Sequence, residues 1–303
     1  MVWIPGGTFA MGSNAHYPEE RPVHPVTVDG FWMDRTPVTN SSFARFVSET
    51  HHVTFAELPP KPQDYPHAKK AMLHPGSLVF IKPPTPVDLV DFHNWWKFVL
   101  GADWRHPRGP NTVSKGREEH PVVHVAYGDA EAYAKWAGKT LPTEAEWERA
   151  ARGGLEGAEY AWGNELTIDG RFLANFWQGE FPWQNLKQDG FEWTSPVGTY
   201  PPNLYGLVDM IGNTWEWTTD WYAPQHPEEK LHACCIPHNP RGGDETASID
   251  PCQPEIRIPR KVIKGGSHLC AANYCRRYRP PARMPEPIDT STCHLGFRCV
   301  VRS

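Results

Sequence analysis

Two cysteines near the C-terminus are the residues of this chain best suited to chemistry. Cys270 and Cys275 follow the pair Gly265-Gly266 and precede the run 276–279, which holds three arginines. At a separation of five residues, two side chains point about 140° apart in a helix and to opposite faces in a strand. They can share one bond or one metal ion only if the backbone between them is irregular. The neighbouring arginines favour thiolate over thiol and so raise reactivity.

Four interpretations of this pair are open from the residues alone. The sulfurs could form a structural disulfide, or they could be buried thiols that pack as apolar side chains. They could also form a redox dithiol or a soft metal site. Two thiolates without imidazole or carboxylate partners favour a low-coordinate ion such as Cu(I) over zinc, which prefers four ligands. Ser267 precedes the pair and Tyr274 lies between its two cysteines; both could orient a substrate or an oxygen species by hydrogen bonding.

A second group of possible ligands is rich in oxygen. The segments 175–182, 189–191 and 209–217 combine carboxylates and amides with glycines, which allow turns whose carbonyls point inward. Hard cations such as Ca²⁺ take ligands of this kind. The alternative is that these are ordinary turn residues around tryptophan clusters. Because no EF-hand-type loop is present, the spacing leaves both interpretations open.

Two further clusters do not match a known metal site. His120 and His124 could resemble a non-haem iron site, but the position two beyond His124 is Ala126, so the required carboxylate is missing. The segment 222–259 has a spacing of His and Cys that fits no usual structural zinc site, and a solvated insert is preferred. The residues concerned are His232, Cys234, Cys235, His238 and Cys252. The chain also lacks a phosphate-binding glycine loop, a dinucleotide fingerprint and a Gly-x-Ser-x-Gly motif.

The elements that must position these residues are short. Three helices are predicted from capping signals and from apolar residues spaced three and four apart. The first is capped by Thr39, the second covers about 129–137 and ends at Gly138, and the third opens with the capping box of Thr143 and Glu146 and runs to Arg152. Strands are predicted at 122–125, 197–200, 261–264 and 297–301, and long loops at 58–86, 101–121 and 222–259.

The composition indicates a loop-rich domain with a packed core. The 303 residues include 25 glycines, 32 prolines and 14 tryptophans, whereas disordered chains are poor in aromatic residues. We find no internal repeat or linker, and predict one domain over 1–303 with a loop insert at about 222–259. The net charge of −5 gives no case for binding nucleic acid or an anionic membrane, and no apolar run is long enough to span a bilayer.

Cysteine usage and the N-terminal sequence indicate a reducing compartment. Seven cysteines cannot all pair within one chain, which favours a reducing compartment with mostly free thiols. The first residues lack the basic region and the apolar stretch of a secretion signal, so none is expected here.

These segments together resemble the formylglycine-generating enzymes, the sulfatase-modifying-factor family, nearly from end to end of the chain. The most specific match is the Gly-Gly-Ser-x-x-Cys-x-x-x-x-Cys element at 265–275. Several of the other matching segments also occur in the wider superfamily. They are 4–12, 36–40, 103–107, 136–148, 174–182, 212–217 and 295–299.

The resemblance implies a fold, a reaction and partners. The fold would be a single mixed α/β (α+β) domain, related to C-type lectins and low in regular secondary structure. The reaction would be the O₂-dependent oxidation of a cysteine in a sulfatase Cys-x-Pro-x-Arg segment to Cα-formylglycine. The substrate would be an unfolded or nascent sulfatase polypeptide, and an external thiol reductant would supply the remaining electrons. Because side chains alone cannot activate O₂, a redox metal or cofactor is needed.

The resemblance also implies site residues. Cys270 and Cys275 match the family's Cu(I)-binding pair, Ser267 and Tyr274 match residues that line its pocket, and Trp215 lies at a position close to it. Two structural Ca²⁺ sites are implied as well. The first would use Asn175, the Phe176 carbonyl, Asp189 and the Phe191 carbonyl; the second would use Asp209, the Gly212 and Thr214 carbonyls and Glu216.

Some positions depart from the family pattern. Ala134 and Ala151 stand where secretory members have cysteines, so Cys299 is expected to lack a disulfide partner, in keeping with a bacterial cytoplasmic protein. His294 and Asp209 stand where relatives often have Asn. The resemblance gives no role to the cysteines of the 222–259 insert, and the carboxylate that would bind the substrate Arg is not identifiable.

Two alternative functions remain. A non-catalytic sulfatase-modifying-factor or lectin-like binding module would share the Trp-rich turns and the calcium positions, but it should lack the cysteine pair. An iron-dependent sulfur oxidase of the same superfamily would need the carboxylate that is missing after His124. The sequence also does not fix whether Cys270 and Cys275 rest as a disulfide, a dithiol or a copper-bound pair.

Overall fold

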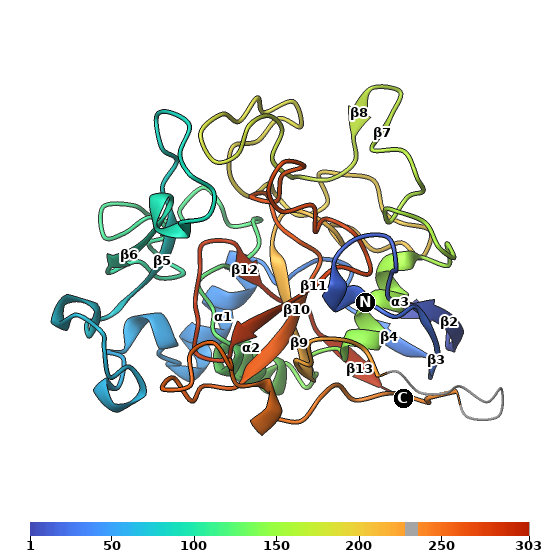
Figure 1. The fold of residues 1–303 in the computed structure, drawn as a ribbon, viewed down its shortest axis with the longest axis horizontal. Helices are drawn as coiled ribbons and strands as arrows, with labels where there is room; N and C mark the ends of the chain where they lie inside the picture. Colours follow the sequence, from blue (N-terminus) through green and yellow to red (C-terminus); the bar gives the residue numbers. More distant parts are fainter. Residues whose placement is uncertain (228–235, 303) are drawn as a thin grey trace.

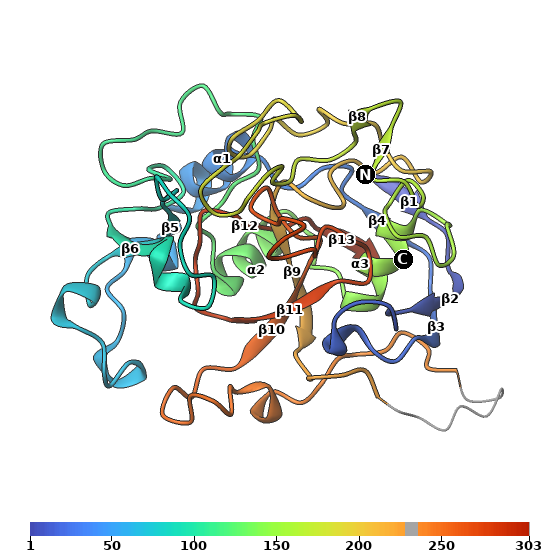
Figure 2. The ribbon, with the colours of Figure 1, turned by 45° about the horizontal axis from the view of Figure 1, so that its top comes forward.

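The centre of the fold is a four-stranded sheet with the strand order β11-β10-β9-β12. The computed structural model describes residues 1–227 and 236–302, and Figures 1 and 2 both show this sheet in the middle of the molecule. Its strands are β9 (Trp215–Trp221), β10 (Arg260–Lys264), β11 (Arg283–Pro287) and β12 (Leu295–Gly296). β12 pairs with β9 in parallel, and the other pairs are antiparallel.

Smaller sheets surround the central one. Both ends of the chain meet in a three-stranded sheet, in which β4 (Phe31–Met33) lies between β1 (Val2–Ile4) and β13 (Val300–Arg302). The remaining strands in the described part of the chain form three antiparallel pairs. Two of these pairs, β5–β6 and β2–β3, lie on opposite sides of the molecule (Figure 1). The three pairs are β2 (Gly7–Met11) with β3 (His24–Val28), β5 (Gly76–Phe80) with β6 (Trp96–Leu100), and β7 (Thr167–Ile168) with β8 (Arg171–Phe172).

The three predicted helices are confirmed. They are α1 (Asn40–Thr50), α2 (Tyr127–Trp136) and α3 (Glu144–Arg152). Thr39 caps α1, and the capping box of Thr143 and Glu146 opens α3. α2 begins two residues earlier than predicted, because the Asp129 carboxylate accepts a hydrogen bond from Ala126 N at 2.9 Å and so caps the helix from within. In the described residues, no helix is long and apolar enough to cross a bilayer.

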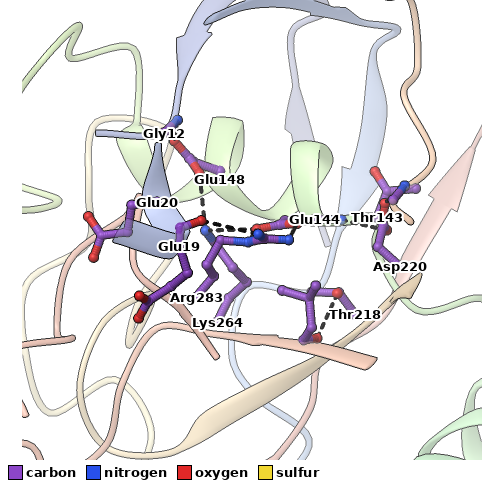
Figure 3. Close-up of polar contacts among 12 residues, drawn as sticks. Gly12, Glu19, Glu20, Thr143, Glu144, Glu148, Thr218, Asp220, Lys264 and Arg283 are labelled. Atoms are coloured by element: carbon purple, nitrogen blue, oxygen red, sulfur yellow. Dashed lines mark hydrogen bonds and ion pairs between the residues drawn. The ribbon is translucent and has the colours of Figure 1, made fainter. Parts of the chain in front are cut away.

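Buried ion pairs fasten α3 to the central sheet. Lys264 at the end of β10 lies 3.0 Å from Glu148, and Arg283 at the start of β11 donates to both carboxylate oxygens of Glu144 at 2.7 and 2.9 Å. Figure 3 shows both basic side chains facing the carboxylates of α3. Because buried charges are tolerated only when they are paired, these contacts fix how the helix lies on the strands that flank the cysteine loop.

Several predicted strands and loops are wrong in detail. The segment 122–125 is extended but forms no strand, because His124 has φ 61°, in the left-handed region, and interrupts it. The segment 197–200 is a turn around Gly198, whose φ is 75°. The predicted loop 58–86 contains β5, and of the predicted strand 297–301 only its end belongs to β13. β10 confirms the strand predicted at 261–264.

The insert at 222–259 is irregular where it is described. It contains one short 3₁₀ turn, Thr246–Ser248. His238 pairs with Asp29 at 2.9 Å, and Cys252 is exposed. His232, Cys234 and Cys235 lie outside the described residues. Within the described part of the chain, no group of three or more His, Cys, Asp or Glu residues is arranged to hold a metal ion.

Candidate active site

The loop between β10 and β11 brings Cys270 and Cys275 together. The backbone N–H groups of Tyr274 and Cys275 both donate to the Ala271 carbonyl, at 3.2 and 2.9 Å, and so close a tight turn. The two sulfur atoms lie 3.2 Å apart as free thiols, well beyond the ~2.05 Å of a disulfide bond. The irregular backbone required by the five-residue spacing is therefore present.

The Gly265-Gly266 pair is needed where the loop begins. Gly265 has φ 94° and Gly266 has φ 71°, a region that residues with a Cβ atom rarely adopt. A Cβ on Gly266 would also lie 2.8 Å from the backbone carbonyl of Arg277. The two glycines thus allow the start of the loop to pack directly against the segment that follows Cys275.

Cys270 is the inner sulfur of the pair. Its side chain is 2% exposed, and the Ser267 N–H donates to Sγ at 3.4 Å. The Trp177 N–H donates to the Cys270 carbonyl at 3.0 Å and so joins the cysteine loop to the segment that contains Trp177. Burial raises the pKa of the Cys270 thiol well above its ordinary value. Ser267 is itself fully buried, and its Oγ accepts a hydrogen bond from Leu269 N, so it shapes the loop from within.

Cys275 is the outer and more acidic sulfur. It is partly exposed, and Nη1 of Arg277 approaches its Sγ at 3.8 Å. The hydrogen bond from the Cys270 thiol, together with the positive charge and hydrogen bond of Arg277, lowers the pKa of Cys275 to about 7. The pair therefore combines one accessible thiolate with one buried neutral thiol.

This asymmetry predicts a selective reaction with alkylating reagents. In metal-free, reduced protein, iodoacetamide should modify Cys275 at neutral pH while Cys270 remains unmodified. The thiolate population of Cys275 rises as the pH increases through about 7, so the rate should increase over that range. Peptide mapping by mass spectrometry at several pH values measures both sites. A midpoint for Cys275 near the ~8.5 of an ordinary cysteine would contradict the prediction.

An aromatic surface lies beside the sulfur pair. The ring of Tyr274, which is 40% exposed, stacks on Phe181 at 4.8 Å between centroids and meets the edge of Trp95 at 5.3 Å. Phe80 at the end of β5 packs against Phe181 from the same cluster. Sequence reasoning identified Tyr274 but missed this support, because Trp95 and Phe181 are far from the cysteines in the chain. The aromatic rings hold the exposed phenol next to the thiols.

Trp215 is buried in the core, whereas His294 is partly buried. Trp215 is 1% exposed in β9 and belongs to the same core cluster as Cys270. The His294 ring packs on Trp96, and its Nδ1 lies 2.6 Å from the Thr292 hydroxyl. Burial lowers the pKa of His294 to about 3, so its imidazole is neutral.

His124 is bound on both sides of its ring. Its Nδ1 lies 2.7 Å from the Ser77 hydroxyl, and its Nε2 lies 2.8 Å from the Pro107 carbonyl. Neither nitrogen is available to a metal ion without breaking a buried hydrogen bond. His124 is therefore not free to act as the iron ligand that an iron-dependent sulfur oxidase would need.

The residues of the first predicted calcium site lie together. Oδ2 of Asp189 accepts a hydrogen bond from Phe176 N at 3.1 Å, and its Oδ1 accepts one from Phe191 N at 3.0 Å. The amide nitrogen of Asn175 donates to the Trp193 carbonyl, which leaves the side-chain oxygen of Asn175 for a cation. Burial raises the pKa of Asp189, and none of the described basic side chains forms an ion pair with it. The Gln178 amide donates to Asp189 Oδ2 at 2.8 Å and also to the Phe176 carbonyl, so a cation here would take the place of that amide. A partly buried carboxylate without a basic partner, next to backbone carbonyls, is a ligand set that suits a hard cation.

The second predicted set fits a cation less well. Both carboxylate oxygens of Glu216 are bound by Arg298, at 2.8–3.0 Å, and one also accepts from the Trp147 indole at 2.7 Å. Asp209 accepts a hydrogen bond from Gly198 N at 2.7 Å, and burial raises its pKa to about 6. Glu216 could bind a cation only by releasing Arg298, so its evident role is that of an ion-pair partner.

Cys299 is a fully buried thiol and is free among the described cysteines. Burial raises its pKa above the ordinary range of a thiol. It therefore has the character of a core residue rather than that of a reactive group.

The chain is similar to proteins of one family over its whole length. The model of the sulfatase-modifying factor enzyme 1-like domain matches residues 1–303. A protein of Mycobacterium tuberculosis named formylglycine-generating enzyme is 52% identical over 302 residues, covering 99% of this chain and 97% of that protein. A protein of the same name from Streptomyces coelicolor is 45% identical, covering 98% of this chain and 88% of that protein.

The fold is shared with more distant solved structures. PvdO from Pseudomonas aeruginosa superposes with a TM-score of 0.63 at 21% identity, covering 98% of this chain and 92% of that chain. The predicted fold class, a mixed α/β fold of the formylglycine-generating-enzyme type with little regular secondary structure, is confirmed. By the match of the family model and by the identity with these relatives, the chain belongs to the sulfatase-modifying factor enzyme 1-like family.

Proposed function

We propose that this protein oxidises the cysteine of a sulfatase Cys-x-Pro-x-Arg segment to Cα-formylglycine with O₂ and a thiol reductant. The observation that carries the proposal is the pair of free sulfurs, Cys270 and Cys275, 3.2 Å apart in a partly open loop. The 52% identity to a protein named formylglycine-generating enzyme supports it. The proposed partners are an unfolded or nascent sulfatase polypeptide and an external thiol reductant, and the bacterial cytoplasmic location stays a prediction.

The donor set suits Cu(I). Two sulfurs lie in contact, and in the described part of the chain no cluster of His, Asp or Glu completes a site for a harder ion. Soft, low-coordinate Cu(I) accepts such a pair, whereas zinc prefers four ligands. Cys270 and Cys275 would hold the ion, which would supply the O₂ chemistry that side chains lack.

The residues around the pair have separable tasks. The buried Cys270 is fixed by the Ser267 N–H at 3.4 Å, and the partly exposed Cys275 has its sulfur beside Arg277. The exposed phenol of Tyr274 is a hydrogen-bonding group next to the thiols and can orient the substrate or an oxygen species. The rings of Phe181 and Trp95 pack against the Tyr274 ring and hold that phenol in place.

The direct test is the conversion of a peptide. The reduced protein, with and without one equivalent of Cu(I), would be incubated under air with a Cys-x-Pro-x-Arg peptide and dithiothreitol, and mass spectrometry would follow the change from thiol to aldehyde. Copper-dependent conversion is expected. If the loaded, reduced protein leaves the peptide unchanged, the non-catalytic binding module becomes the better interpretation.

We also propose that Asn175, the Phe176 and Phe191 carbonyls and Asp189 bind a structural Ca²⁺ ion. Since such an ion binds the folded state, Ca²⁺ at 100 times its Kd should stabilise the protein by about 2.7 kcal/mol. Thermal unfolding with Ca²⁺, with Mg²⁺ and with EGTA measures the effect, which Asp189→Asn should remove. Equal melting temperatures in Ca²⁺ and in EGTA would rule out this site.

A further inference from the structure

The three arginines that follow Cys275 point to different places. Arg276 pairs with Glu159 at 3.1 Å and donates to the Tyr160 hydroxyl at 3.0 Å. Arg279 is fully buried in an ion pair. Arg277 is the one of the three whose guanidinium reaches the active-site thiol, with Nη1 at 3.8 Å from Cys275 Sγ. The sequence suggested that all the arginines of 276–279 favour the thiolate form of the cysteines. In the structure, this effect comes from Arg277.

The guanidinium of Arg277 is held by two residues, Glu19 and Tyr17. Its Nε and Nη2 both donate to Oε1 of Glu19, at 3.2 and 2.6 Å. The ring of Tyr17 lies flat beneath it, with the guanidinium carbon 3.8 Å from the ring centroid. These contacts leave Nη1 as the donor that faces Cys275. Glu19 and Tyr17 thus determine where the positive charge lies.

The turn that carries Tyr17 and Glu19 is itself firmly anchored. It forms a short 3₁₀ helix, Pro18–Glu20, in which Glu20 pairs with Arg279 and both side chains are fully buried. The Tyr17 hydroxyl accepts a hydrogen bond from Arg276 N at 2.9 Å. Arg283 donates to the Glu19 carbonyl at 3.1 Å while it binds α3, as Figure 3 shows. This N-terminal turn is therefore a fixed support for the cysteine loop.

We propose that Tyr17 and Glu19 are positioning residues that hold Arg277 against Cys275 and so set the affinity of the sulfur pair for Cu(I). The inference rests on the proposed function, in which both sulfurs are ligands. Two thiolates and one Cu(I) ion leave a net negative charge in a partly buried place, and the hydrogen bond from Arg277 offsets its cost. Removal of such partners behind a metal ligand typically costs about 10–100-fold in affinity.

The affinity for Cu(I) can be measured without turnover. Reduced, metal-free protein would compete anaerobically with a chromogenic Cu(I) chelator. Arg277→Met should weaken binding by about 10–100-fold, and Glu19→Gln and Tyr17→Leu by about 10-fold each. Arg277→Lys should recover part of the loss, since lysine keeps the positive charge but lacks the planar set of N–H donors of the guanidinium. Glu159→Gln is the matched control: it removes the carboxylate partner of the adjacent Arg276 and should leave the affinity unchanged.

A second measurement uses the metal-free protein. The alkylation rate of Cys275 at neutral pH should fall in Arg277→Met and in Glu19→Gln, and stay at the wild-type value in Glu159→Gln, with melting temperatures confirming that each variant is folded. Wild-type affinity and wild-type alkylation rates in folded Arg277→Met and Glu19→Gln would overturn this inference alone. A wild-type protein that does not bind Cu(I) would overturn it together with the copper site of the proposed function.

Discussion

Cys275→Ser and Cys270→Ser are each expected to lower the rate of peptide conversion by at least about 10⁴-fold, the scale seen when a central catalytic side chain is removed. The reason is that a hydroxyl oxygen is a hard, weakly acidic donor and cannot replace a thiolate as a Cu(I) ligand. Loss of one sulfur also removes the 3.2 Å contact on which the two-sulfur site depends. Both variants should therefore lose tight Cu(I) binding along with activity.

Cys252→Ser serves as the control for this experiment. Cys252 is an exposed thiol in the insert, and its replacement should leave both conversion and copper binding unchanged. Because Cys270 is 2% exposed, serine there would bury a hydroxyl, and Cys270→Ala provides a second variant without that cost. Wild-type rates in folded Cys275→Ser would show that the chemistry lies elsewhere in the molecule.

Arg298→Met is expected to cause a large loss of stability, about 3–5 kcal/mol. Arg298 and Glu216 have side chains that are 0% and 1% exposed, and the guanidinium also donates to the Val208 and Asp209 carbonyls at 3.0 Å. Without Arg298, the Glu216 carboxylate would be left buried and unpaired. The free energy of unfolding, measured by urea denaturation, should fall accordingly.

The double variant Glu216→Gln/Arg298→Met separates the ion pair from simple loss of packing. Because it removes the unpaired charge, it should be more stable than Arg298→Met alone. Arg45→Met, at the exposed pair of Arg45 and Glu49, should change the stability far less, since exposed pairs contribute little. If Arg298→Met unfolded at the same urea concentration as Arg45→Met, the buried pair would contribute no more to stability than the exposed pair.

The helices were predictable because their signals are local. Thr39, Thr143 and Glu146 cap helix ends through hydrogen bonds that span three residues, so the sequence nearby contains the whole interaction. The predicted strands failed more often, since a strand is defined by a distant partner. The segment 122–125 has apolar residues, but its N–H groups donate to Val38 and Thr292 carbonyls across the fold rather than to a neighbouring strand.

The active site also combines residues that are near neighbours in the sequence with residues from distant segments. Ser267, Cys270, Tyr274 and Cys275 lie within nine residues, and the glycines before them already require a tight, irregular loop. Cys270 and Cys275 could therefore be identified, and their proximity anticipated, before any coordinates. The exposed Tyr274 was identified with them, but the rings of Trp95 and Phe181 that support it come from distant segments.

The sequence by itself determined the family, the three helices and the thiol pair, because motifs and caps are interactions among near neighbours. Only the tertiary structure decided that Arg277, and not Arg276 or Arg279, faces Cys275. Its partner Glu19 precedes it by 258 residues, and three arginines within four positions look alike in sequence until their carboxylate partners are located in space. For the same reason the buried ion pair of Glu216 with Arg298 could not be read from the sequence, in which Glu216 is a calcium ligand only by resemblance. The sequence specifies which side chains are charged, whereas the fold determines which groups they pair with.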